Sequence, residues 1–103
     1  MTTPRFRSKD ASESRVLAFD FSADLDTGET LTGSPDVTVH LALGPDANPS
    51  AILAGGNAFD TAHKMFLVPV TGGTQGTEYL IKVVSNTSNA AKRLALSGVL
   101  PVT

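Results

Sequence analysis

Short segments in which apolar and polar residues alternate constrain the fold of this chain more than any other feature of its sequence. A period of two residues is typical of strands with one buried face, and no segment of useful length has the spacing of an amphipathic helix. The segments predicted as strands are 15–22, 36–42, 65–70, 78–85 and 92–102. Turn residues separate them about every ten positions. We therefore expect an all-β fold.

The length of 103 residues fits one domain. Strand lengths and turn spacing favour a single β-sandwich of about seven strands, which we assign to residues 15–103. Residues 1–14 are polar and charged, with few apolar side chains such as Phe6 and Ala11. This N-terminal arm is either a frayed terminus or an extension that folds onto a neighbouring subunit.

Four positions carry expectations about local structure. Pro69 lacks an N–H, which predicts a sheet edge or a bulge, and Gly98 predicts a bulge or a switch between sheets. Residues 50–53 fit either a short strand or a loop. Tyr79 is the only tyrosine, and its entry Gly-Thr-Glu-Tyr resembles the penultimate strand of immunoglobulin-like sandwiches, where a tyrosine hydroxyl ties the incoming loop to the strand.

The formal charge of -2 conceals a segregated pattern. Residues 1–15 carry four basic and two acidic side chains, residues 16–60 carry seven acids and no Lys or Arg, and residues 61–103 carry four basic side chains and one acid. Such a split either steers the basic part of one copy toward the acidic part of another or is cancelled when the domain folds. The sparse basic residues disfavour binding of nucleic acid.

Residues that carry chemistry are few. Without Cys the chain has no disulfide, thiolate zinc site or Cys nucleophile, and no nucleophile elbow or phosphate loop accompanies His40 and His63. Asp24 and Asp26 begin like a calcium loop, but Pro35 stands where a bidentate Glu is needed. We therefore expect no enzymatic activity, no metal and no cofactor.

The apolar runs are far shorter than the ~20 residues that span a membrane. The N-terminus also lacks the apolar stretch of a signal peptide. We therefore expect a protein that is made in the cytoplasm and does not contact a membrane.

Several motifs follow one another along almost the whole chain. They are Pro4-Arg5-Phe6, Lys9-Asp10, Phe19-Asp20-Phe21-Ser22-Ala23-Asp24-Leu25, Gly28-Glu29-Thr30-Leu31, residues 68–71 with Gly72-Gly73-Thr74, Gly76-Thr77-Glu78-Tyr79 and Leu96-Ser97-Gly98-Val99-Leu100-Pro101-Val102. Their order resembles the small, immunoglobulin-like virion proteins of tailed bacteriophages that are described as fiber-tail adaptors. Residues 44–60 match that pattern poorly, and Phe21 stands where a Trp is common.

The resemblance implies a structural role at the neck or tail of the virion. Copies arranged in a ring would bridge tail or portal-proximal proteins to fibers or spikes, through head-to-tail contacts between unlike surfaces. The expected interaction residues are Arg5, Phe6 and Arg7 in the arm and, as an acidic partner surface, Asp24, Asp26 and Glu29.

Three alternatives use the same sandwich. A head-surface decoration domain would lie on the capsid, and a calcium-dependent adhesive domain would lose stability on chelation. A carbohydrate-binding domain would need an exposed aromatic platform, whereas the chain has no Trp and its single tyrosine is assigned to the fold.

Overall fold

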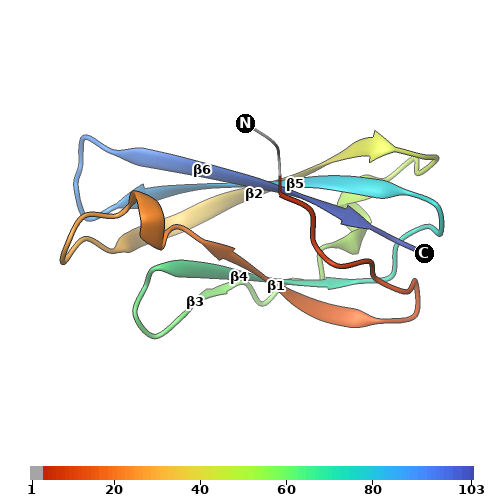
Figure 1. Ribbon diagram of the computed structural model, residues 1–103, viewed down its shortest axis with the longest axis horizontal. Helices are drawn as coiled ribbons and strands as arrows, with labels where there is room; N and C mark the ends of the chain where they lie inside the picture. Colours follow the sequence, from red (N-terminus) through yellow and green to blue (C-terminus); the bar gives the residue numbers. More distant parts are fainter. Residues whose placement is uncertain (1–3) are drawn as a thin grey trace.

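The computed structural model describes residues 4–103 as two three-stranded antiparallel sheets packed face to face, drawn as an upper and a lower layer in Figure 1. One sheet has the order β1-β4-β3, with β1 Ser14–Asp20, β4 Met65–Thr71 and β3 Ala58–Phe59. The other has the order β2-β5-β6, with β2 Leu31–Leu43, β5 Glu78–Thr87 and β6 Arg93–Pro101. The all-β prediction is confirmed, with six strands instead of about seven.

The alternation in the sequence produces the core directly. On β1, Leu17 and Phe19 point inward, and on the central strand β5 the side chains of Tyr79, Ile81 and Val83 are fully buried. Burial of an aliphatic or aromatic side chain contributes about 1.5–3 kcal/mol. The two inner faces therefore hold the sheets together without a disulfide.

The strand order corresponds to strands B, E, D and C, F, G of an immunoglobulin-type sandwich. The arm lies beyond β6, where it forms parallel bridges from Arg5 to Val99 and from Lys9 to Val102. It then crosses to β1, as the red segment of Figure 1 shows. Residues 1–3 of the predicted arm lie outside the described residues.

The strand predicted over 36–42 begins earlier, at Leu31, because residues that are typical of a turn lie inside the strand. Gly33, Ser34 and Pro35 form a bulge inside β2 instead of ending it. Thr32 pairs with Asn86 and Asp36 pairs with Val84, so three residues of β2 lie opposite one residue of β5.

Two further expectations concern Pro69 and residues 50–53. Pro69 lies on β4, paired with Val16 and without a bulge, but beyond the two residues of β4 that pair with β3, so this end of β4 is locally an edge. Its missing N–H points to the side of β3, which pairs with β4 only at Leu67 and Phe66, so the proline interrupts no strand pairing. Of residues 50–53, the first three belong to the short 3-10 helix η2, Pro49–Ile52, and Leu53 forms an isolated antiparallel bridge with Val70. A second such turn, η1, spans Ser22–Asp24.

Candidate interaction surface

The ring of Phe6 docks on the arm's own chain. It meets the Phe19 ring edge-on, with the centroids 5.3 Å apart, and lies against the backbone of Gly98. A β-carbon at Gly98 would overlap the Phe6 ring. Gly98 pairs with Ile81 in unbroken register, so the predicted bulge or sheet switch is wrong. Glycine is needed at this position because the Phe6 ring occupies the space where a side chain would lie.

Hydrogen bonds hold the backbone of the arm on both sides. The Phe6 N–H donates to the Val99 carbonyl at 2.8 Å, and the Val99 N–H donates to the Pro4 carbonyl at 2.9 Å. From β1, the Arg15 guanidinium donates to the carbonyls of Arg7 and Ser8 at 3.0 and 2.7 Å. The arm is thus part of the sandwich edge in the single chain.

Lys9, for which the sequence predicted no contact, is the most deeply buried of the described arm residues. Only 1% of it is exposed, and its ammonium group donates to the carbonyls of Asp10 and Gly72 at 2.9 and 2.6 Å. Burial lowers the pKa of Lys9 below its ordinary value. An ammonium held only by carbonyls fixes the arm against the β4–β5 loop, and no local sequence pattern signals this contact.

The two arginines that flank Phe6 differ in what they contact. Arg5 donates to both carboxylate oxygens of Glu78 at 3.2 and 2.8 Å, which holds the pKa of Glu78 below its ordinary value. Arg7 is exposed and forms no ion pair within residues 4–103. Arg7 is therefore the arm cation that is free for a partner. The prediction that the arm contacts a neighbouring subunit stays a prediction.

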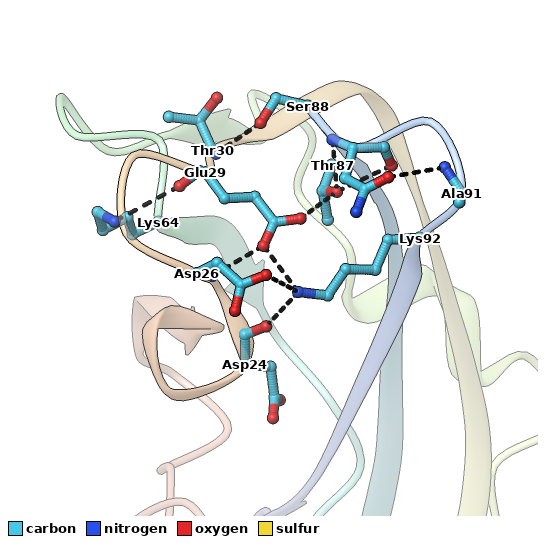
Figure 2. A network of polar contacts seen from close by, with 10 residues as sticks. Asp24, Asp26, Glu29, Thr30, Lys64, Thr87, Ser88, Ala91 and Lys92 are labelled. Atoms are coloured by element: carbon cyan, nitrogen blue, oxygen red, sulfur yellow. Dashed lines mark hydrogen bonds and ion pairs between the residues drawn. The ribbon is translucent and has the colours of Figure 1, made fainter.

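Glu29 lies at the opposite end of the molecule, in the network of Figure 2. Its carboxylate accepts hydrogen bonds from the Lys92 ammonium at 2.7 Å, the Asp26 N–H at 2.8 Å and the Thr87 hydroxyl at 2.7 Å. These donors, Lys92 first, lower the pKa of Glu29 to about 2. With 6% of its surface exposed, Glu29 ties the β1–β2 loop to the β5–β6 loop.

The other two acids of this loop are exposed. Asp26 lies 3.6 Å from the Lys92 ammonium but has an exposed side chain, and Asp24 contributes its backbone carbonyl to Lys92 at 2.8 Å. The ammonium thus occupies the place where these oxygens converge. Among the described residues, no group of three or more His, Cys, Asp or Glu is arranged to hold a metal ion. The carboxylates of Asp24 and Asp26 remain available at the surface, and their contact with a partner stays a prediction.

Folding cancels part of the segregated charge. Lys92 and Arg93, from the basic C-terminal segment, pair with Glu29 and Asp36 of the acidic middle at 2.7 and 2.9 Å. The Arg93–Asp36 pair is exposed on both sides and contributes little to stability. Charge counts along the sequence therefore overstate the charge that the folded surface presents.

Tyr79 joins three elements at the end of the molecule where β5 begins. Its hydroxyl accepts a hydrogen bond from the Thr74 N–H at 2.8 Å and donates to the Asp46 carboxylate at 2.6 Å. The hydrogen bond from the tyrosine hydroxyl contributes most to lowering the pKa of Asp46. This geometry ties the β4–β5 loop to β5, as in a tyrosine corner.

A family comparison covers most of the sandwich and the last part of the arm, from Lys9 onward. The family described as podophage GP4 fiber-tail adaptor protein gp77 matches residues 9–98, which run from the buried Lys9 to Gly98. The chain belongs to the podophage fiber-tail adaptor family. This membership identifies a structural adaptor of a phage virion tail. Searches of curated proteins and of solved structures found no match to the adaptor.

The histidines of the adaptor lie on separate elements. His40 is exposed on the outer face of β2, whereas His63 lies in the β3–β4 turn with a φ of 55° and stacks on Phe59 at 5.0 Å. A pocket of about 300 Å³ between the β2 bulge and β3 has Phe59 and Phe66 in its wall, together with Asn57 and no charged side chain. These positions do not bring an acid, a base and a nucleophile together. Within residues 4–103, no helix is long and apolar enough to cross a membrane.

Proposed function

We propose that the adaptor is a non-enzymatic link at the neck or tail of the virion. In this role it joins tail or portal-proximal proteins to tail fibers or spikes. Its partners are proteins, including further copies of itself arranged in a ring. It binds neither nucleic acid nor a membrane. The observation that carries the proposal is the family match over residues 9–98 of the 103-residue chain.

The surface supports a role in protein contacts at both ends of the sandwich. Arg7 at the arm end and Asp24 and Asp26 at the other end keep charges that are exposed. Opposite charges at opposite ends suit contacts in which unlike surfaces of successive copies meet. The Glu29 carboxylate does not belong to this exposed surface, because it accepts hydrogen bonds from three groups within the chain.

The test is assembly of particles without the adaptor. Particles of a phage whose adaptor gene is deleted should have heads and tails but no fibers in negative-stain electron micrographs. Expression of the wild-type chain in the host should restore the fibers. Particles that keep all their fibers, or a labelled adaptor found on the head surface, would contradict the proposal.

Charge reversal tests the surface residues. Arg7→Glu should reduce the amount of adaptor in particles, because it reverses an exposed charge at the proposed contact. Lys82→Glu is the matched control, since Lys82 is exposed on the outer face of β5, away from the arm and the acidic loop. Equal incorporation of both variants would remove Arg7 from the contact.

A further inference from the structure

The two sheets leave open edges on opposite sides of the sandwich. β1 ends one sheet and β2 ends the other, while the arm covers β6. The arm and β1 lie on the same side, since Phe6 contacts Phe19. The remaining edge strand, β3, has 2 residues and follows the irregular segment 55–57, a common protection of sheet edges.

The free edge of β1 presents unpaired backbone groups. The Phe21 N–H donates to the Lys64 carbonyl at 2.9 Å, and paired residues along an antiparallel ladder alternate between bonded and non-bonded. Leu17 therefore bonds to β4, whereas the N–H and C=O groups of Val16 and Ala18 face outward. Among the described residues, no backbone hydrogen bond from another segment satisfies these outward-facing groups.

The same argument applies to β2. The Val102 N–H donates to the Thr77 carbonyl at 2.9 Å, so alternate residues of β5, including Ile81, bond to β6. Lys82 then bonds to Thr38 of β2, and the backbone groups of the residues between, Val37, Val39 and Leu41, face the open edge.

Exposed apolar side chains gather on these two strands. Within residues 4–103, the exposed large hydrophobic side chains are Val16 at 61%, Leu41 at 39% and Leu43 at 61%. Val16 belongs to β1 and the other two belong to β2. Pro35, Asp36 and the bulge protect the beginning of the β2 edge, so the part of β2 that can act as a template for strand addition is residues 37–43. Each edge therefore offers both unpaired backbone groups and apolar surface.

We propose that the β1 edge of one adaptor copy pairs with the β2 edge of the next copy, so that strand addition builds the assembly. This inference rests on the proposed function, in which copies contact one another. Because the two edges are different surfaces, the contact is heterologous and repeats around a ring or along a helix. A two-fold pairing of β1 with β1 would leave Leu41 and Leu43 exposed.

The directions of strands and side chains agree with this pairing. β1 and β2 run in opposite directions in Figure 1, and they belong to the lower and the upper layer, so a copy shifted sideways and down by one layer brings its β2 antiparallel to β1. Val16 points away from the core of its sandwich, and Leu41 points toward the core of its own. In the shifted copy these two directions coincide, as side chains on one face of a continuous sheet require. The 7 residues of β1 are also close in length to the 6 residues of β2, 36–41, that lie between its two irregularities.

Thiol cross-linking in assembled particles tests the proposal, because the chain has no cysteine of its own. Particles carrying the double variant Val16→Cys with Leu41→Cys are treated with a short bifunctional thiol reagent and analysed on a denaturing gel. We expect a ladder of dimers, trimers and higher multimers. The matched control is Ala95→Cys with Leu41→Cys, since Ala95 is exposed on the outer face of β6, away from both open edges, and should give no ladder.

Three results would overturn the proposal. They are absence of the ladder, dimers from Val16→Cys alone, which indicate a two-fold contact, and cross-links from these cysteines to another virion protein. Fibers on particles that show no ladder would refute only strand addition between copies. Fibers on particles that lack the adaptor altogether would refute the proposed function.

A second variant does not depend on cysteine chemistry. Val16→Lys places a charge on the free edge, and its incorporation into particles should fall by about tenfold or more. Ala95→Lys is the control and should be incorporated like the wild type. Because both sites are exposed, the two purified chains should keep the wild-type melting temperature. Equal incorporation of the two variants would also overturn the proposal.

Discussion

The edges of β6 and β1 lie on the same side of the sandwich, yet the arm covers only the edge of β6. The arm closes β6 with backbone hydrogen bonds, the Phe6 ring over Gly98 and the buried Lys9. β1 keeps outward-facing backbone groups and an exposed Val16. The arm therefore completes its own sheet, and strand addition can take place only at the edges that remain open.

Removal of the Phe6 ring should have the largest effect on the closed edge. Phe6→Ala should lower the free energy of unfolding by about 3 kcal/mol, at the lower end for a lost Phe because the ring is only half-buried. Chemical denaturation measures the change. Val16→Ala is the matched control on the open edge, and an equal loss there would remove the distinction between the two edges.

A methyl group at Gly98 should displace the same ring from the other side. Gly98→Ala should cost about 1–2 kcal/mol by overpacking, although alanine in a strand is otherwise favoured over glycine. The arm should then be cleaved faster by a protease at low concentration. Ser97→Ala, on the opposite face of β6, should leave both quantities unchanged, and stabilisation by Gly98→Ala would show that Phe6 is not docked there.

Acid should weaken the loop end of the molecule through Glu29. Its pKa falls from the ordinary 4.5 to about 2 on folding, so its contribution is fully present above about 4.5 and is lost as the pH falls toward 2. Unfolding measured at several pH values should therefore show a smaller decrease across this window in Glu29→Gln than in the wild type. An unchanged slope would mean that Lys92 and Thr87 do not hold the carboxylate.

Substitution on the open edge should have the smallest effect on the free chain. Val16→Lys should change the free energy of unfolding by no more than about 0.5 kcal/mol, because the side chain is already exposed. Thermal unfolding of the dilute chain checks this value. A large loss would show that Val16 packs within the domain.

The sequence was sufficient to predict the strands that alternate cleanly. β4 and β5 begin at the predicted residues Met65 and Glu78, and β1 begins one residue before the predicted Arg15. β1 and β5 were found because apolar side chains alternate along them, and β4 because it is an apolar run between turn residues. β2 was shortened in prediction, since Gly33 and Pro35 are used in a bulge as readily as in a turn.

The contacts of the candidate site depend on residues far apart in the sequence. Glu29 was grouped with Asp24 and Asp26 by spacing, but Lys92, which neutralises it, lies 63 positions away. The space above Gly98 is filled by Phe6 from the other end of the chain. Alternation reports which face of a strand is buried, and it carries no information on which distant side chain meets it.

Amide hydrogen exchange in the free, dilute chain, measured residue by residue by NMR, tests the contrast between the two edges most directly. The N–H groups of Phe6, Lys9 and Val99 should exchange slowly, because each donates to a backbone carbonyl, whereas those of Val16 and Ala18 should exchange rapidly. Rapid exchange at Phe6 and Lys9, or protection at Val16 and Ala18, would contradict an arm that closes β6 and leaves β1 open.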